Sequence, residues 1–91
     1  MVRVHFTANL QRHLAAPTVT LPDGGGTVRS ALAQVFAANP ALRSYVLDDQ
    51  DGVRKHVSIF LDGTQIADRQ HLSDAVADGA EIWVMQALSG G

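Results

Sequence analysis

Hydrophobic and polar residues alternate with a period of two in several stretches of the chain, a pattern typical of strands with one buried face. In the first stretch Val2, Val4 and Phe6 alternate with polar residues. The Asp62-Gly63 pair favours a tight turn between two later stretches. Together these signals predict strands at residues 2–6, 18–21, 57–61, 64–66 and 81–87.

Between the second and third strands the period changes to that of a helix. Val28, Leu32 and Val35 recur at helical spacing, and Thr27 is a residue type that favours the N-cap. Pro40 closes the helix, because the residue before a proline is displaced from the α region. The pattern predicts a helix over about residues 28–39, a short turn or helix at residues 41–46 and an exposed loop at residues 48–52.

The predicted order is strand, strand, helix, strand, short strand, strand, which is typical of an α+β domain with one main helix packed on a mixed sheet. The first and last strands are expected to lie side by side in the centre of that sheet, as in a β-grasp (ubiquitin-like) domain. The predicted domain covers residues 1–88, and residues 89–91 are predicted to form a flexible tail. A chain of 91 residues can bury one modest core, which leaves no room for a deep catalytic cavity.

The composition removes several classes of function. The net charge is −2, so we expect binding neither to nucleic acid nor to an anionic membrane. The absence of cysteine excludes disulfides, thiolate metal sites and a cysteine nucleophile. No run approaches the ~20 apolar residues of a membrane-spanning helix, and the N-terminus lacks the pattern of a signal peptide. A cytoplasmic location is therefore expected.

Gly90 and Gly91 follow the last predicted strand and form the strongest candidate site. Glycine has no Cβ, so such a tail can enter a slot too narrow for other residues. A terminal carboxylate on Gly91, with a pKa near 3.5, is a poor electrophile until adenylation turns it into a mixed anhydride. A sulfur nucleophile can then displace the nucleotide and leave a thiocarboxylate. On this interpretation the chain is a carrier without a catalytic side chain; the alternative is a frayed terminus.

A second candidate site is an apolar cluster on one face of the predicted sheet. If the helix covers the other face, the alternation of the strands leaves Phe60, Trp83 and Met85 uncovered. An exposed apolar cluster of this kind favours a docking surface for a partner protein. The alternative is that residues 41–56 fold over part of the cluster.

The remaining chemical patterns each favour a structural interpretation. The histidines at positions 5, 13, 56 and 71 lack the spacing of metal ligands. A calcium loop among Asp48, Asp49 and Asp51 fails in register. The glycines at positions 24–26 precede a helix without the lysine or the glycine spacing of a phosphate-binding loop. We therefore expect no metal site and no bound cofactor.

Three segments carry a resemblance to a known family, and they are the Val57–Gly63 hairpin, the Asp78–Ile82 approach to the last strand and the Ala87–Gly91 tail. Together with the β-grasp order, they resemble the MoaD/ThiS family of sulfur carrier proteins. The resemblance implies that an adenylyltransferase of the ubiquitin-activating type uses ATP to adenylate the terminal glycine, which is then thiocarboxylated. Only Gly90 and Gly91 match the functional motif of the family.

The resemblance further implies that the sulfur passes to a synthase that makes a molybdopterin-type cofactor or cysteine. The chain would then be a protein co-substrate, or the small subunit of such a synthase, and not an enzyme. Two other functions stay open on the sequence. A protein modifier would use the same adenylate, because a lysine amine can attack Gly91 where a sulfur nucleophile would. An interaction module with an inert tail would use neither.

Overall fold

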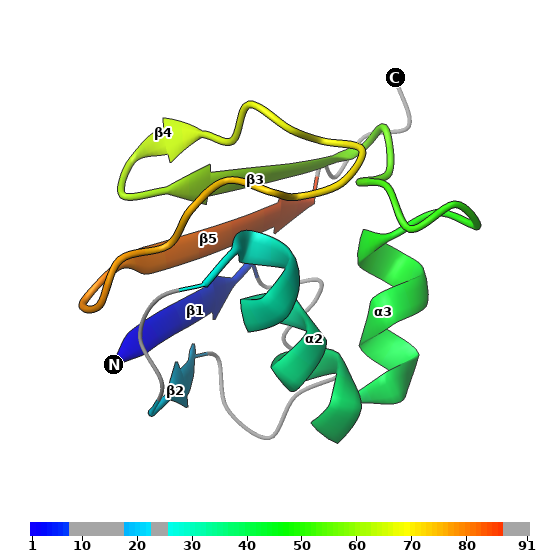
Figure 1. The fold of residues 1–91 in the computed structure, drawn as a ribbon. Coiled ribbons are helices and arrows are strands. Elements are labelled where there is room, and N and C mark those ends of the chain that lie inside the picture. Colours follow the sequence, from blue (N-terminus) through cyan, green and yellow to red (C-terminus); the bar gives the residue numbers. More distant parts are fainter. Residues whose placement is uncertain (8–17, 23–25, 87–91) are drawn as a thin grey trace.

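The computed structural model describes residues 1–7, 18–22 and 26–86 of the chain, and within them a mixed sheet packs against a layer of helices (Figure 1). In chain order the elements are β1 (Val2–Phe6), β2 (Thr18–Leu21), α2 (Val28–Ala38), α3 (Pro40–Val46), β3 (Val57–Leu61), β4 (Thr64–Gln65) and β5 (Glu81–Gln86). The predicted strands and the predicted main helix are confirmed over the described residues, with β4 one residue shorter than expected; position 87, the predicted end of the last strand, lies outside the described residues.

The strand order in the sheet is β2-β1-β5-β3-β4. β1 and β5 pair in parallel at the centre, and the other neighbouring pairs are antiparallel. The first and last strands of the described chain are therefore adjacent, as Figure 1 shows. This arrangement confirms the predicted β-grasp order.

α2 begins at a capping box. The Thr27 hydroxyl accepts a hydrogen bond from the Ser30 amide at 3.2 Å, and the Ser30 hydroxyl accepts one from the Thr27 amide at 3.0 Å. These bonds satisfy amides that the first helical turn leaves without partners. The buried side of the helix consists of Val28, Ala31, Leu32, Val35 and Phe36.

Pro40 ends one helix and begins the next. It occupies the start of α3, where a missing amide hydrogen costs nothing and the fixed φ suits the helix. The prediction of a short turn or helix after Pro40 is thus confirmed as a helix. Leu42 and Val46 of α3 are completely buried and belong to the same core as the inward residues of the strands.

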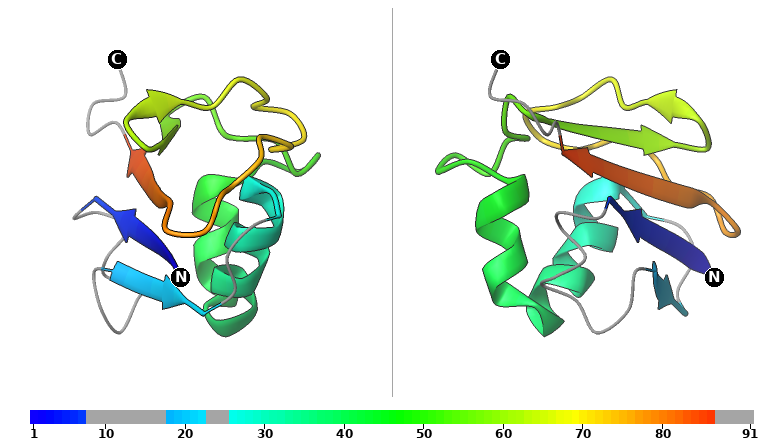
Figure 2. Two further views of the ribbon diagram at one scale, coloured as in Figure 1. Left: turned by 60° about the vertical axis from the view of Figure 1, so that its left-hand side comes forward. Right: turned by 180° about the vertical axis from the view of Figure 1, so that it is seen from behind.

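Both helices lie on one side of the sheet (Figure 2). The segment after α3 also contributes to that core, through Leu47 and Val53. The alternative in which residues 41–56 cover the apolar cluster is therefore wrong, because this segment packs on the helix side. The reason is its own pattern, since its apolar residues are the ones that complete the core between the helices and the sheet.

The long connection from β4 to β5 has little regular structure and is held by side chains. Arg29 of α2 donates hydrogen bonds to the backbone carbonyls of His71 at 2.7 Å, Asp51 at 2.8 Å and Gln70 at 3.3 Å. Leu72 is fully buried, with a φ of +51° that a leucine seldom adopts. The guanidinium of Arg29 therefore ties α2 to two separate loops.

Candidate functional site

The face of the sheet opposite the helices carries the outward side chains of its central strands. His5 of β1 and Phe60 of β3 are both Cα partners of Trp83 on β5. These three residues therefore form one row across three strands. Met85 lies two residues further along β5, on the same face, opposite Ser58. The structure thus brings Phe60, Trp83 and Met85 together, as the alternation predicts.

These residues differ in how much surface they leave open. Trp83 is 40% exposed and Met85 is 38% exposed, whereas Phe60 is partly buried. Among the described residues, the other large hydrophobic side chains with such exposure are Met1 and Tyr45. Tyr45 belongs to α3, in the helix layer. The exposed apolar surface of the sheet is therefore concentrated on β5, and its role as a docking surface stays a prediction.

His5 is the member of this row that the sequence does not single out. Its ring stacks on the Trp83 indole, with the ring centroids 4.1 Å apart and the planes at 18°. Its Nε2 lies 2.8 Å from a carboxylate oxygen of Glu81, and its Nδ1 lies 3.0 Å from the Thr18 hydroxyl. The outward position of His5 on β1 was visible in the pattern, and the first and last strands were expected to be neighbours, but the register that places His5 beside Trp83 was not visible. We call His5, Phe60, Trp83 and Met85 the outer cluster.

Charged side chains frame one end of the outer cluster. The Glu81 carboxylate that meets His5 also lies 3.5 Å from the Arg3 guanidinium. Both members of the Arg3–Glu81 pair are exposed, so the pair adds at most about 1 kcal/mol of stability. Its larger effect is to give this end of the apolar surface a polar border, which is typical of protein interfaces.

β5 connects the outer cluster to the glycine tail. Gln86, its last residue, is the Cα partner of Val57 and donates a backbone hydrogen bond to the Thr7 hydroxyl at 3.2 Å. The tail follows directly, and the predicted site at Gly90 and Gly91 lies outside the described residues. An enzyme that binds the outer cluster would therefore bind the strand from which the tail continues.

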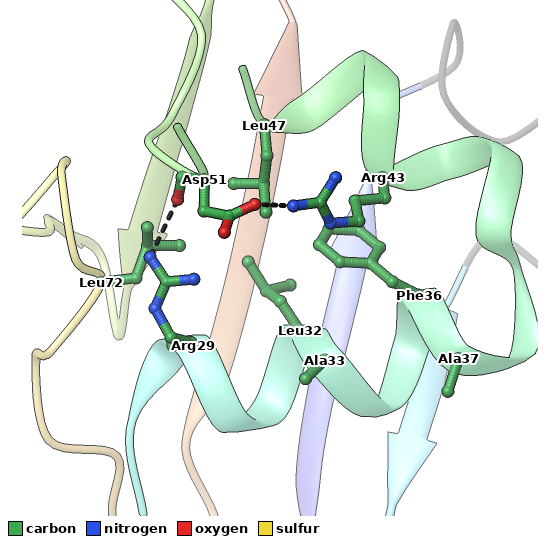
Figure 3. A pocket seen from close by; sticks show the side chains of 9 residues that line it. All are labelled: Arg29, Leu32, Ala33, Phe36, Ala37, Arg43, Leu47, Asp51 and Leu72. Atoms are coloured by element: carbon green, nitrogen blue, oxygen red, sulfur yellow. Dashed lines mark hydrogen bonds and ion pairs between the residues drawn. The ribbon is translucent and has the colours of Figure 1, made fainter. Parts of the chain in front are cut away.

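A separate cavity of about 460 Å³ lies on the helix side of the molecule (Figure 3). Leu32 and Phe36 of α2 contribute apolar surface to it, and Arg29 and Arg43 lie at its margin. Both arginines are already engaged by Asp51, Arg29 through the backbone carbonyl at 2.8 Å and Arg43 through an ion pair with the carboxylate. The described residues that line the cavity therefore present neither an activated nucleophile with its base nor an unpaired cation.

The acidic loop after α3 is organised around its own backbone. The Asp48 carboxylate accepts hydrogen bonds from the amides of Gln50 at 2.8 Å and Gly52 at 3.0 Å. These amides hold the pKa of Asp48 below its ordinary value. Within the part of the chain that the structure describes, no three histidine or acidic residues form a group able to hold a metal ion. None of the helices described is long and apolar enough to span a membrane.

Comparison with known proteins places the fold in a recognised group. The family model of the ThiS family matches residues 4–91. The small archaeal modifier protein 1 of Haloferax volcanii is 35% identical over 69 residues, which are 76% of this chain and 75% of that protein. The family model covers most of the chain, including α2, β3 and β5.

Solved structures with the same fold extend the comparison. The crystal structure of SAMP1 from Haloferax volcanii superposes with a TM-score of 0.82 at 31% identity, over 99% of this chain and 98% of that one. A chain from the crystal structure of the BexX/CysO complex of Amycolatopsis orientalis superposes with a TM-score of 0.84 at 17% identity, over the whole of both chains. The second likeness, at this low identity, concerns the fold alone.

Proposed function

Because the chain belongs to the ThiS family, we propose that it is a sulfur carrier whose reactive group is the carboxylate of Gly91. The observation that carries the proposal is the extent of the family match, which runs through β5 and includes the Gly90-Gly91 pair. Glycine at both positions allows the tail to lie in a narrow channel beside a nucleotide. The family consists of small carrier and modifier proteins, and the chain accordingly acts as a co-substrate of other enzymes.

The proposed chemistry has two steps. A carboxylate oxygen of Gly91 attacks the α-phosphorus of ATP, and pyrophosphate leaves. Hydrosulfide then attacks the acyl carbon, the bond to AMP breaks, and the sulfur-bound proton passes to solvent. The product is a thiocarboxylate in which one oxygen has been replaced by sulfur, with no net oxidation. The adenylating enzyme supplies the ATP site, and this chain supplies the carboxylate and the surface that aligns it.

The outer cluster is the proposed docking surface for that enzyme. Trp83 and Met85 are the exposed apolar side chains nearest in sequence to the tail among the described residues. Large aromatic side chains at the centre of an interface contribute a disproportionate share of binding energy. Docking at β5 would fix the strand that leads into the tail and so reduce the freedom of Gly91 before it reacts.

The first test is the intact mass of the full chain isolated from its own cells without acid treatment. We expect a population in which sulfur has replaced one oxygen, and its loss when Gly91 is deleted. A second variant carries one alanine after Gly91, which moves the carboxylate and adds a Cβ beside it. That variant should fold normally and form no adenylate. Thiocarboxylate formation by the extended chain would refute the proposal.

A protein modifier is the second candidate function, and one observation favours it. The relative that is 35% identical to this chain is named a modifier protein. The same adenylate serves both functions, since a lysine amine can attack the acyl carbon and expel AMP. Conjugates of high mass that contain this chain, and that disappear on deletion of Gly91, would support modification. A thiocarboxylate without such conjugates would support the carrier alone.

The recipient of the sulfur and the place of the reaction are further parts of the proposal. The recipient would be a synthase that builds a molybdopterin-type cofactor or cysteine, and both reactions would take place in the cytoplasm. Incubating the purified thiocarboxylated chain with each type of synthase and following loss of the sulfur by mass distinguishes the two recipients.

A further inference from the structure

His5 is more firmly held than any other side chain on the outward face of β1. Its side chain is 15% exposed, and both ring nitrogens have partners, Glu81 at 2.8 Å and Thr18 at 3.0 Å. An ionised carboxylate only accepts hydrogen bonds, so Nε2 carries the hydrogen that points to Glu81. The Thr18 hydroxyl can donate or accept, which lets it serve Nδ1 in either protonation state. The orientation of the ring is therefore fixed by neighbours on β2 and β5.

The fixed imidazole limits the freedom of Trp83. Its plane lies against the indole at a centroid distance of 4.1 Å, and stacked aromatic pairs gain stability beyond their buried area. The indole is nevertheless 40% exposed, so it is held against the imidazole while part of it stays open to a partner. A side chain with this combination is already ordered before a partner arrives.

We propose that His5 is a positioning residue for partner recognition, holding the Trp83 indole in the orientation that the adenylating enzyme binds. The inference rests on the proposed function, because it takes the outer cluster as the docking surface. His5 need not touch the partner. Its contribution is to remove the entropic cost of ordering the Trp83 side chain on binding.

Two substitutions separate the stack from the hydrogen bonds. His5→Ala removes both, whereas His5→Phe keeps an aromatic ring beside the indole and loses the bonds to Thr18 and Glu81. Trp83 is the single tryptophan of the chain, so its near-ultraviolet circular dichroism and fluorescence anisotropy report its mobility directly. We expect His5→Ala to weaken the tryptophan band and lower the anisotropy, and His5→Phe to restore both.

The functional readout is ATP–pyrophosphate exchange by the host adenylating enzyme with the full chain as the varied substrate. We expect His5→Ala to raise the KM for the chain about fivefold, the equivalent of ordering one side chain, with kcat unchanged. His5→Phe should return the KM to within about twofold of the unaltered chain, a difference too small to count as an ordering cost. Tyr45→Ala, which removes an exposed aromatic ring from α3, serves as the matched control and should leave the KM unchanged.

The outcomes distinguish the inference from the proposed function. If Trp83→Ala raises the KM and His5→Ala does not, His5 has no positioning role and the docking surface stands. If His5→Ala and His5→Phe raise the KM equally, the hydrogen-bonding imidazole itself is required, and the positioning role is refuted. If Trp83→Ala leaves the KM unchanged, the outer cluster is not the docking surface, and the inference fails with it.

Discussion

Truncation of Trp83 to alanine is the most direct test of the outer cluster. The substitution removes the indole, its stack on His5 and the largest exposed apolar area on β5. It leaves Gly91, the substrate of the proposed reaction, untouched. A loss of activation in this variant would therefore arise from docking and not from the chemistry of the tail.

The expected size of the effect follows from the exposure of the indole. A tryptophan side chain presents about 250 Å² at most, and 40% exposure leaves about 100 Å² of it open to a partner. Burial of that area at about 25 cal/mol per Å² contributes about 2.5 kcal/mol. Complete coverage by the enzyme corresponds to a loss of about 70-fold in affinity, and coverage of half the area to a loss of about eightfold.

The assay is isothermal titration of the adenylating enzyme with the full chain in the absence of ATP, which measures the Kd without a contribution from chemistry. Tyr45→Ala is the control for loss of an exposed aromatic ring outside the outer cluster. Thermal unfolding of each variant tests the fold, and we expect the lost stack to cost about 1 kcal/mol of stability.

If a folded Trp83→Ala variant binds with a Kd within twofold of that of the unaltered chain, the assignment of the outer cluster as the docking surface is refuted. An equal loss of affinity in Tyr45→Ala would also refute it, because the helix layer would then take part in binding. A loss of affinity larger than about 100-fold would exceed the contribution that burial of the exposed indole area can make. Such a loss would require a change elsewhere in the sheet.

Two further predictions concern the stability of the scaffold. In a urea titration, Arg29→Met should lower the free energy of unfolding by about 2 kcal/mol, because three backbone carbonyls lose a charged donor. Arg43→Met loses an exposed ion pair with Asp51 and should lower the free energy of unfolding by less than about 1 kcal/mol in the same titration. Equal losses would contradict the assignment of Arg29 as the tie between the loops. Acidification should destabilise the chain below about pH 4, because the Ser73 hydroxyl lowers the pKa of Asp68 and backbone amides lower that of Asp74. These carboxylates stabilise the fold above the ordinary aspartate pKa and cease to do so as the pH falls through their lowered values, so the deficit of Asp74→Asn relative to the unaltered chain should shrink on acidification; a constant deficit would contradict the assignment.

The local pattern was sufficient for most elements of the fold. Val2, Val4 and Phe6 alternate because their strand has one buried face, and all three are buried in the structure. Thr27 was recognised as an N-cap because its hydroxyl can accept from an amide in the first turn, which it does at Ser30. Such signals depend on neighbours in sequence, so the elements can be predicted without the tertiary structure.

The position of α3 could not be predicted from the local pattern alone. The residues after Pro40 were consistent with a turn or a helix and with either face of the sheet. Packing selects a helix on the α2 side of the sheet, because Leu42 and Val46 belong to the same apolar core as the buried residues of α2 and the strands. With α3 packed on the helix side, Trp83 and Met85 stay exposed. From the sequence alone, their exposure was one of two alternatives.

The sequence by itself determined the β-grasp order, the outward position of Phe60, Trp83 and Met85, and the candidate chemistry of Gly90 and Gly91, since each of these depends on residue type and short-range spacing. The tertiary structure alone decided that His5 stacks on Trp83 between Thr18 and Glu81. The register of the β1–β5 pairing, in which His5 is the Cα partner of Trp83, creates that contact. The sequence predicted the two strands as neighbours, but their register depends on how the whole core packs, which no local pattern records.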